Sequence, residues 1–132
     1  WNEARGGSGM PALGQIGFLQ AADLRDNLFV VATGNGGGRF LVRRTCRLLD
    51  QLYGGDPLGV PLIDALPSPL DRLAADCCEH ALLARRPQFD AGMLELAEDV
   101  EIRYRLAFMP LSANGQLVDH LLGAISFRMN RD

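Results

Sequence analysis

Residues 52–66 read LYGGDPLGVPLIDAL, and this stretch decides the fold class. Gly54 stands where a helix ends on a residue of positive φ, and the apolar spacing of residues 47–53 predicts the short helix that it ends. Pro57 and Pro61 prevent that helix from resuming. The stretch therefore combines a helix end, a tight turn and a second short apolar segment that returns to the core.

Two short β-rich segments precede it. Residues 28–32 (LFVVA) and 40–45 (FLVRRT) predict strands, and the glycine-rich residues 33–38 between them predict a hairpin loop. Further upstream, residues 1–17 are rich in glycine and predict an irregular N-terminal arm, whereas residues 18–26 predict a short helix.

The clearest helix is predicted from Pro69 to Arg85. Ser68 is a suitable N-cap, Pro69 suits the first helical position, and Asp71 lies in the first turn, where a carboxylate favours the helix dipole. One apolar face repeats at helical spacing and consists of Leu70, Leu73, Ala74, Cys77 and Ala81.

The last third of the chain predicts strands over residues 89–96, 101–109 and 117–127, with a turn at 112–116. In residues 101–109 apolar and charged side chains alternate, which indicates a half-buried antiparallel strand. The inward face consists of Ile102, Tyr104, Leu106 and Phe108, and the outward face of Glu101, Arg103 and Arg105. Strands grouped on both sides of the helices indicate an α+β fold, with helices packed on one face of an antiparallel sheet.

Composition limits the function classes. The chain has 132 residues, enough for one domain, and a net charge of −3, with 13 arginines and no lysine. A nucleic-acid-binding protein would show a basic stripe, and a membrane protein a long apolar run, so we predict neither partner. Three cysteines form no disulfide framework, which favours a reducing, cytoplasmic location.

Several segments, in their order and spacing, resemble the PAS domain, and in particular the small stand-alone PAS-like family common in alphaproteobacteria. The segments that carry the resemblance are Trp1 with Arg5-Gly6-Gly7, Arg39 to Arg43, Leu52-Tyr53-Gly54 with Leu58-Gly59 and Leu62, and Met109-Pro110-Leu111 with Gly115, Val118-Asp119 and Leu122-Gly123. The chain departs from the family at Arg44, where an aliphatic residue is usual.

The resemblance implies a single PAS-like domain over residues 1–132, with an N-terminal arm and short helix at 1–26 and a PAS core at 27–132. It implies a five-stranded antiparallel sheet with helices on one face. The function expected is that of a non-enzymatic sensor or interaction domain in bacterial signal transduction. It would act through a homodimer or a signalling protein partner, with a small ligand between helices and sheet or with none. The sequence identifies no cofactor, catalytic residue or metal site.

The ligand-binding residues expected in such a pocket are Phe40, Val42, Arg44, Cys77, Tyr104 and Phe108. If Phe40 and Val42 face the core, alternation places Arg44 on the same face. A buried guanidinium needs a partner, either a protein carboxylate (Glu95, Asp64 or Glu79) or an acidic ligand. The hydroxyl of Tyr104 likewise needs a hydrogen-bond partner.

Two alternatives stay open. One is a small enzyme of the NTF2-like or ketosteroid-isomerase-like cone fold, which would need an inward Asp or His beside Tyr104 as a general base. The other is a PAS-shaped module with a filled core that serves only as a docking surface. The adjacent Cys77 and Cys78 with His80 offer too few ligands at the right spacing for a zinc site, so we interpret the cysteines as core residues.

Overall fold

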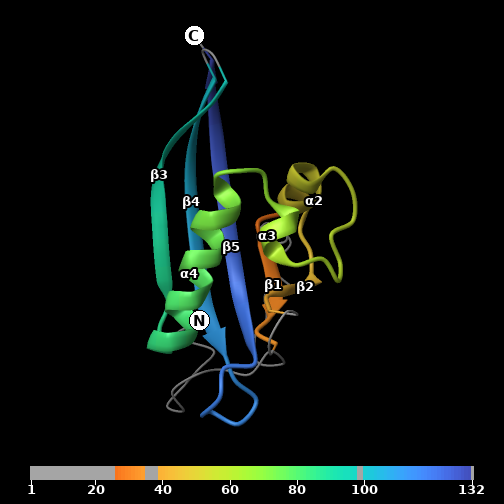
Figure 1. The fold of residues 1–132 in the computed structure, drawn as a ribbon, viewed down its shortest axis with the longest axis vertical. Coiled ribbons are helices and arrows are strands. Elements are labelled where there is room, and N and C mark those ends of the chain that lie inside the picture. Colours follow the sequence, from red (N-terminus) through yellow and green to blue (C-terminus); the bar gives the residue numbers. More distant parts are fainter. Residues whose placement is uncertain (1–25, 35–38, 98–99, 132) are drawn as a thin grey trace.

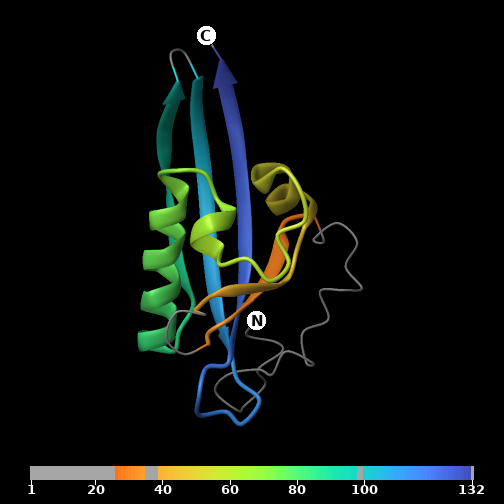
Figure 2. The same cartoon turned by 45° about the vertical axis from the view of Figure 1, so that its right-hand side comes forward.

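The computed structural model describes residues 26–34, 39–97 and 100–131 (Figure 1). The predicted N-terminal arm, residues 18–25 of the predicted first helix and most of the predicted 33–38 loop lie outside these residues. The described strands form one antiparallel sheet of five strands in the order β2-β1-β5-β4-β3. Helices cover one face of it (Figures 1 and 2), so the predicted α+β architecture is confirmed.

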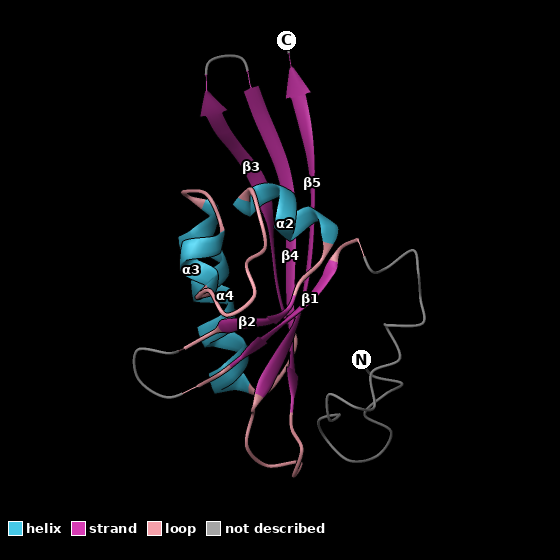
Figure 3. Cartoon of the chain, turned by 90° about the vertical axis from the view of Figure 1, so that its right-hand side faces the viewer, coloured by secondary structure: helices cyan, strands magenta, loops and turns pink. Residues whose placement is uncertain are grey.

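The strands lie close to their predicted positions. They are β1 (Leu28–Ala32), β2 (Leu41–Arg44), β3 (Gln88–Ala97), β4 (Val100–Leu111) and β5 (His120–Arg131). The largest difference is at β5, which was expected over residues 117–127 and is shifted toward the C-terminus at both ends. Residues 112–119 instead form the connection between β4 and β5. At their other ends β3, β4 and β5 extend beyond the helices, as Figure 3 shows.

The alternation in β4 is confirmed. Ile102, Tyr104, Leu106 and Phe108 are buried, whereas Glu101, Arg103 and Arg105 are exposed. Pairing with β3 and β5 extends this pattern across the sheet, because directly opposite residues of paired strands share a face. The face under the helices is called the inner face below, and the opposite one the outer face.

Arg44 does not follow the expected alternation. Val31 pairs with Val42, but Val30 pairs with Arg44, so β2 has one extra residue, Arg43, at this point. Such a bulge shifts the following residue to the other face of the sheet. Arg44 is therefore exposed and lies opposite Val30, which faces away from the helices, and its predicted inward orientation is wrong.

The helices are α2 (Arg47–Tyr53), α3 (Leu62–Ala65) and α4 (Leu70–Ala84). Gly54 ends α2 as predicted, with φ of 83° and its N–H donating to the carbonyl of Asp50. The predicted cap of α4 is wrong: the N-cap is Pro69, not Ser68, and no side chain caps the helix. At the other end Arg85 adopts a left-handed conformation and ends α4. No helix in the described ranges is long and apolar enough to cross a membrane.

Most buried residues form one cluster between the helices and the inner face of the sheet. A second, smaller cluster lies on the outer face, where Val30, Leu111 and Leu122 are buried and Leu28 and Met109 pack against them. The protein thus has apolar surface on both faces of the sheet, and each face is a candidate for function.

Candidate functional site

Five of the six predicted pocket residues come together in the main core cluster. Phe40, Val42, Cys77, Tyr104 and Phe108 are between 0% and 7% exposed, and they come from β2, α4, β4 and the turn before β2. Arg44 is the exception, because the bulge places it outside. The arginine cannot anchor a ligand in the core from this position, so a pocket there would be almost entirely apolar.

The inner face is closely packed around Phe108. Its ring meets the ring of Phe29 edge to face, with centroids 5.8 Å apart and an interplanar angle of 80°. The Phe29 ring in turn lies directly over Gly123 of β5. Among the described residues no buried side-chain nitrogen or oxygen atom lacks a hydrogen-bond partner. The described core therefore presents no unpaired polar atom that calls for a ligand.

Tyr104 finds its partner within the protein. Its hydroxyl donates to Oδ2 of Asp90 on β3 at 3.1 Å. Gly92, opposite Tyr104 in the register, makes room for it, since a Cβ there would lie 3.0 Å from the hydroxyl oxygen. Burial, followed by the hydrogen bond and the negative charge of Asp90, raises the pKa of Tyr104. The sequence had predicted the need for a partner but not Asp90.

A hollow of about 260 Å³ opens beside this pair, between α4 and β3. Its lining is Leu73, Asp76, Cys77, His80, Gln88, Phe89 and Asp90. Of the predicted pocket residues only Cys77 reaches it. The hollow joins acidic, imidazole and thiol groups, yet the described residues include no cluster of three or more His, Cys, Asp or Glu able to hold a metal ion.

The surroundings of the cysteines do not favour a nucleophilic or metal-binding role. All three, Cys46, Cys77 and Cys78, are free and buried. Burial raises the pKa of the Cys77 thiol to about 11, with a further contribution from the charge of Asp90. Burial also raises the pKa of Cys46 and, well above its usual value, that of Cys78. Since the thiolate is the reactive form, these raised pKa values favour the protonated, less reactive thiol at neutral pH.

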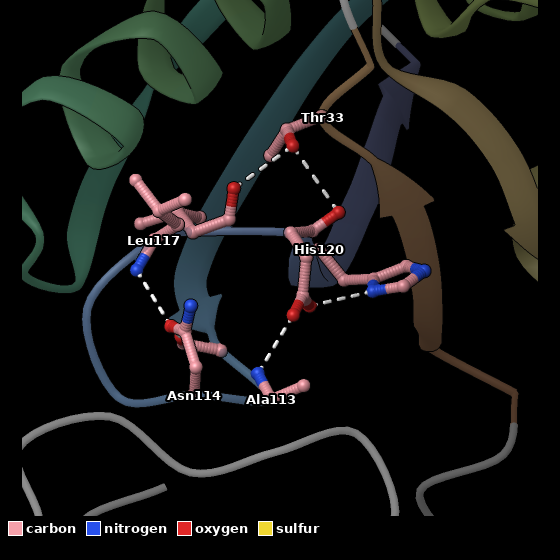
Figure 4. A network of polar contacts seen from close by, with 8 residues as sticks. Thr33, Ala113, Asn114, Leu117 and His120 are labelled. Atoms are coloured by element: carbon pink, nitrogen blue, oxygen red, sulfur yellow. Dashed lines mark hydrogen bonds and ion pairs between the residues drawn. The ribbon is translucent and has the colours of Figure 1, made fainter.

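The connection between β4 and β5 carries a polar network, shown in Figure 4. The hydroxyl of Thr33 donates to the two backbone carbonyls that precede His120, at 3.0 and 3.2 Å. The carboxylate of Asp119 accepts from the N–H of Ala113 at 2.6 Å and contacts Nδ1 of His120 at 2.7 Å. The contacts drawn connect the turn to the end of β1, and the His120 ring joins them through Asp119, so we interpret this histidine as structural.

The outer face carries two further hollows. One, of about 420 Å³, is lined mainly by apolar groups of β1, β3, β4 and β5, including Leu28, Phe89, Ala107 and Ala124. The other, of about 430 Å³, is lined by Arg103, Arg105, Ser126, Phe127 and Arg128. Arg103 and Arg105 lie on the outward face that the alternation of residues 101–109 predicts. That alternation indicates a shared face for the two arginines, but by itself it does not indicate a site.

No family model and no curated protein matches the chain. Solved structures do. A crystal structure of a sensory box sensor histidine kinase from Vibrio cholerae matches with a TM-score of 0.58 at 14% identity, covering 84% of this chain and 90% of that one. The Rhodobacter sphaeroides LOV protein matches with a TM-score of 0.56 at 16% identity, covering 85% of this chain and 68% of that one. At these identities the likeness concerns the fold.

Proposed function

We propose that this chain, whose PAS fold the structural neighbours confirm, is a non-enzymatic module of sensory signal transduction. It works through contacts with other proteins, and its interior is packed. Both neighbours bear this fold, and one of them is a sensor histidine kinase by its printed description. The partner is a second copy of the chain or another signalling protein, and we place the module in the cytoplasm. Such a module transmits a signal by changing which surface it presents.

The observation that carries this proposal is the burial of the residues expected to line a pocket. Phe40, Val42, Tyr104 and Phe108 belong to one buried cluster that includes helix residues, and the described buried polar atoms are satisfied. A ligand site in this place would need an apolar cavity with a few convergent polar groups. The described hollows lie instead beside α4 and on the outer face.

The test is to purify the protein natively, record its absorbance spectrum, denature it and analyse the released small molecules by mass spectrometry. We expect no chromophore and no compound in stoichiometric amount. A stoichiometric compound that protects the protein against thermal unfolding would overturn the packed-interior proposal and support the predicted pocket.

A second candidate is a small polar ligand in the hollow between α4 and β3. The observation that favours it is Cys77, which belongs to the core cluster and also lines this hollow next to Asp90. If a compound is released, Asp90→Asn and Cys77→Leu should reduce its retention, whereas Arg44→Ala should not.

The cone-fold enzyme is not supported by this topology. That alternative required an acidic group beside Tyr104, and Asp90 does lie there. The strand order and the structural neighbours, however, are those of the PAS fold. We therefore interpret the Tyr104–Asp90 pair as a structural hydrogen bond between β4 and β3.

A further inference from the structure

Three arginines form a cationic band on the outer face. Arg103 and Arg105 project from β4 on the same side, and Arg128 of β5 lies directly opposite Arg103 in the register. All three are exposed and line the same hollow of about 430 Å³. Like charges directly opposite each other on paired strands destabilise a sheet. The band is therefore an arrangement that folding alone does not favour.

None of these arginines forms an ion pair within residues 26–34, 39–97 and 100–131. The nearest carboxylates on this face by register are Glu95 and Glu101, which lie opposite each other one pair nearer the β3–β4 turn. They make no ion pair with the band either. Carboxylates of the described residues thus leave these guanidinium donors available for carboxylates from outside.

An apolar hollow adjoins the band. Arg105 and Ser126 line both hollows, so the two lie side by side. Phe89, which is 74% exposed, lies across from Ala107 in the next outward row of the sheet. Along β4 the charged and apolar sites are four residues apart, from Arg103 to Ala107, which is about 13 Å in an antiparallel strand.

We propose that this face binds an acidic, amphipathic helix of a partner protein, with carboxylates on Arg103, Arg105 and Arg128 and an apolar side chain beside Phe89. This inference rests on the proposed role as an interaction module and names the chemistry of its partner. A helix rises about 1.5 Å per residue and repeats every 3.6 residues, so an apolar anchor and a central carboxylate about seven or eight residues apart lie on one face, roughly 11–12 Å from each other.

Charge and shape favour a protein segment over other anions. A free phosphate would leave the apolar hollow unfilled. A nucleic acid would meet few further cations on a chain whose net charge is −3. An amphipathic helix fills both parts of the surface at once, as helices bury an apolar stripe against the face of a sheet.

The experiment measures fluorescence anisotropy of a labelled helical peptide of about 14 residues with leucines at one end and three glutamates centred about seven or eight residues away on the same helix face. Matched peptides replace the glutamates by lysines or the leucines by alanines. The protein variants are Arg103→Glu with Arg128→Glu, and Phe89→Ser. Arg72→Glu, which reverses the charge of an exposed arginine on α4, is the control for a charge reversal away from this face. Circular dichroism and thermal unfolding establish that each variant folds.

We expect the glutamate peptide to bind in a salt-dependent manner and the lysine peptide not to bind. The double reversal should weaken binding by about tenfold or more, Phe89→Ser by several-fold without altering the salt dependence, and Arg72→Glu by less than about twofold.

The inference is overturned if the folded double variant binds as the unmodified chain does, or if no glutamate peptide binds at about millimolar concentration. It is also overturned if inorganic phosphate or anionic vesicles bind through these arginines and the peptide does not. A ligand released from the interior would overturn the packed-interior proposal alone, so the two failures are distinguishable.

Discussion

The ring of Phe29 occupies the space that a side chain at Gly123 would need. The two residues are register partners on β1 and β5, and a Cβ built on Gly123 would lie 2.4 Å from Cζ of Phe29. The same ring packs edge to face on Phe108 of β4. Because Gly123 has no side chain, the Phe29 ring can pack in the middle of the inner face.

Gly123→Ala should destabilise the fold by about 1–3 kcal/mol, because the added methyl group overpacks a core that the helices close from the other side. Urea unfolding followed by circular dichroism measures this. The matched control is Gly55→Ala, where a Cβ meets nothing within 4 Å. Equal stability of the two variants would show that the Phe29 ring can move away without cost.

Gly54→Ala should cost about 1 kcal/mol although its Cβ also meets open space, because φ is 83° at this C-cap. The neighbouring Gly55→Ala again serves as the control, since that residue does not have a left-handed backbone. The measurement is the difference in urea midpoint between the two variants. If the two midpoints coincide, the left-handed cap is not what ends α2.

Tyr104→Phe should destabilise the protein by about 0.5–1.5 kcal/mol, because it removes the 3.1 Å hydrogen bond to Asp90 and leaves the ring in place. Tyr53→Phe is the control, because Tyr53 is 41% exposed. Thermal unfolding of both variants against the unmodified chain tests the prediction. A larger loss for Tyr53→Phe than for Tyr104→Phe would contradict it.

Alkaline pH should destabilise the fold through Cys77. Its folded pKa is raised from 9.0 to about 11, so the unfolded chain releases this proton first as pH rises. The stability that Cys77 contributes is therefore complete below pH 9.0 and is lost as pH rises through about 11. Urea midpoints from about pH 8 to pH 11 should fall less steeply for Cys77→Ala than for the unmodified chain. The difference between the two curves isolates this thiol from Cys78, Cys46 and Tyr104, and parallel curves would refute the prediction.

Sequence patterns predicted the features that depend only on residues close to each other in the chain. The alternation of residues 101–109 identified the buried face of β4, since period two is a property of one strand. Gly54 identified the end of α2, because a left-handed cap favours glycine wherever the helix packs. The predicted N-cap of α4 was wrong because the sequence allows the helix to begin at Pro69 after Ser68 or at Leu70 after Pro69. In the structure the non-helical backbone of Pro69 makes it the N-cap.

The site depended on relationships between strands. Arg44 was placed inward by alternation, but an extra residue opposite β1 turned it outward, and a bulge is visible only once two strands are paired. Asp90 became the partner of Tyr104, and Arg128 the neighbour of Arg103, only through the β3–β4 and β4–β5 registers.

The sequence by itself determined the α+β order, the limits of most helices and strands, the inward face of β4 and the resemblance to the PAS fold, because periodicity, capping and turn chemistry act within a few residues. Tertiary structure alone decided that the expected pocket residues pack together, that Arg44 lies outside, and that three arginines from two strands share a face with an apolar hollow. Register and burial are properties of paired segments, and no single segment of the chain contains them.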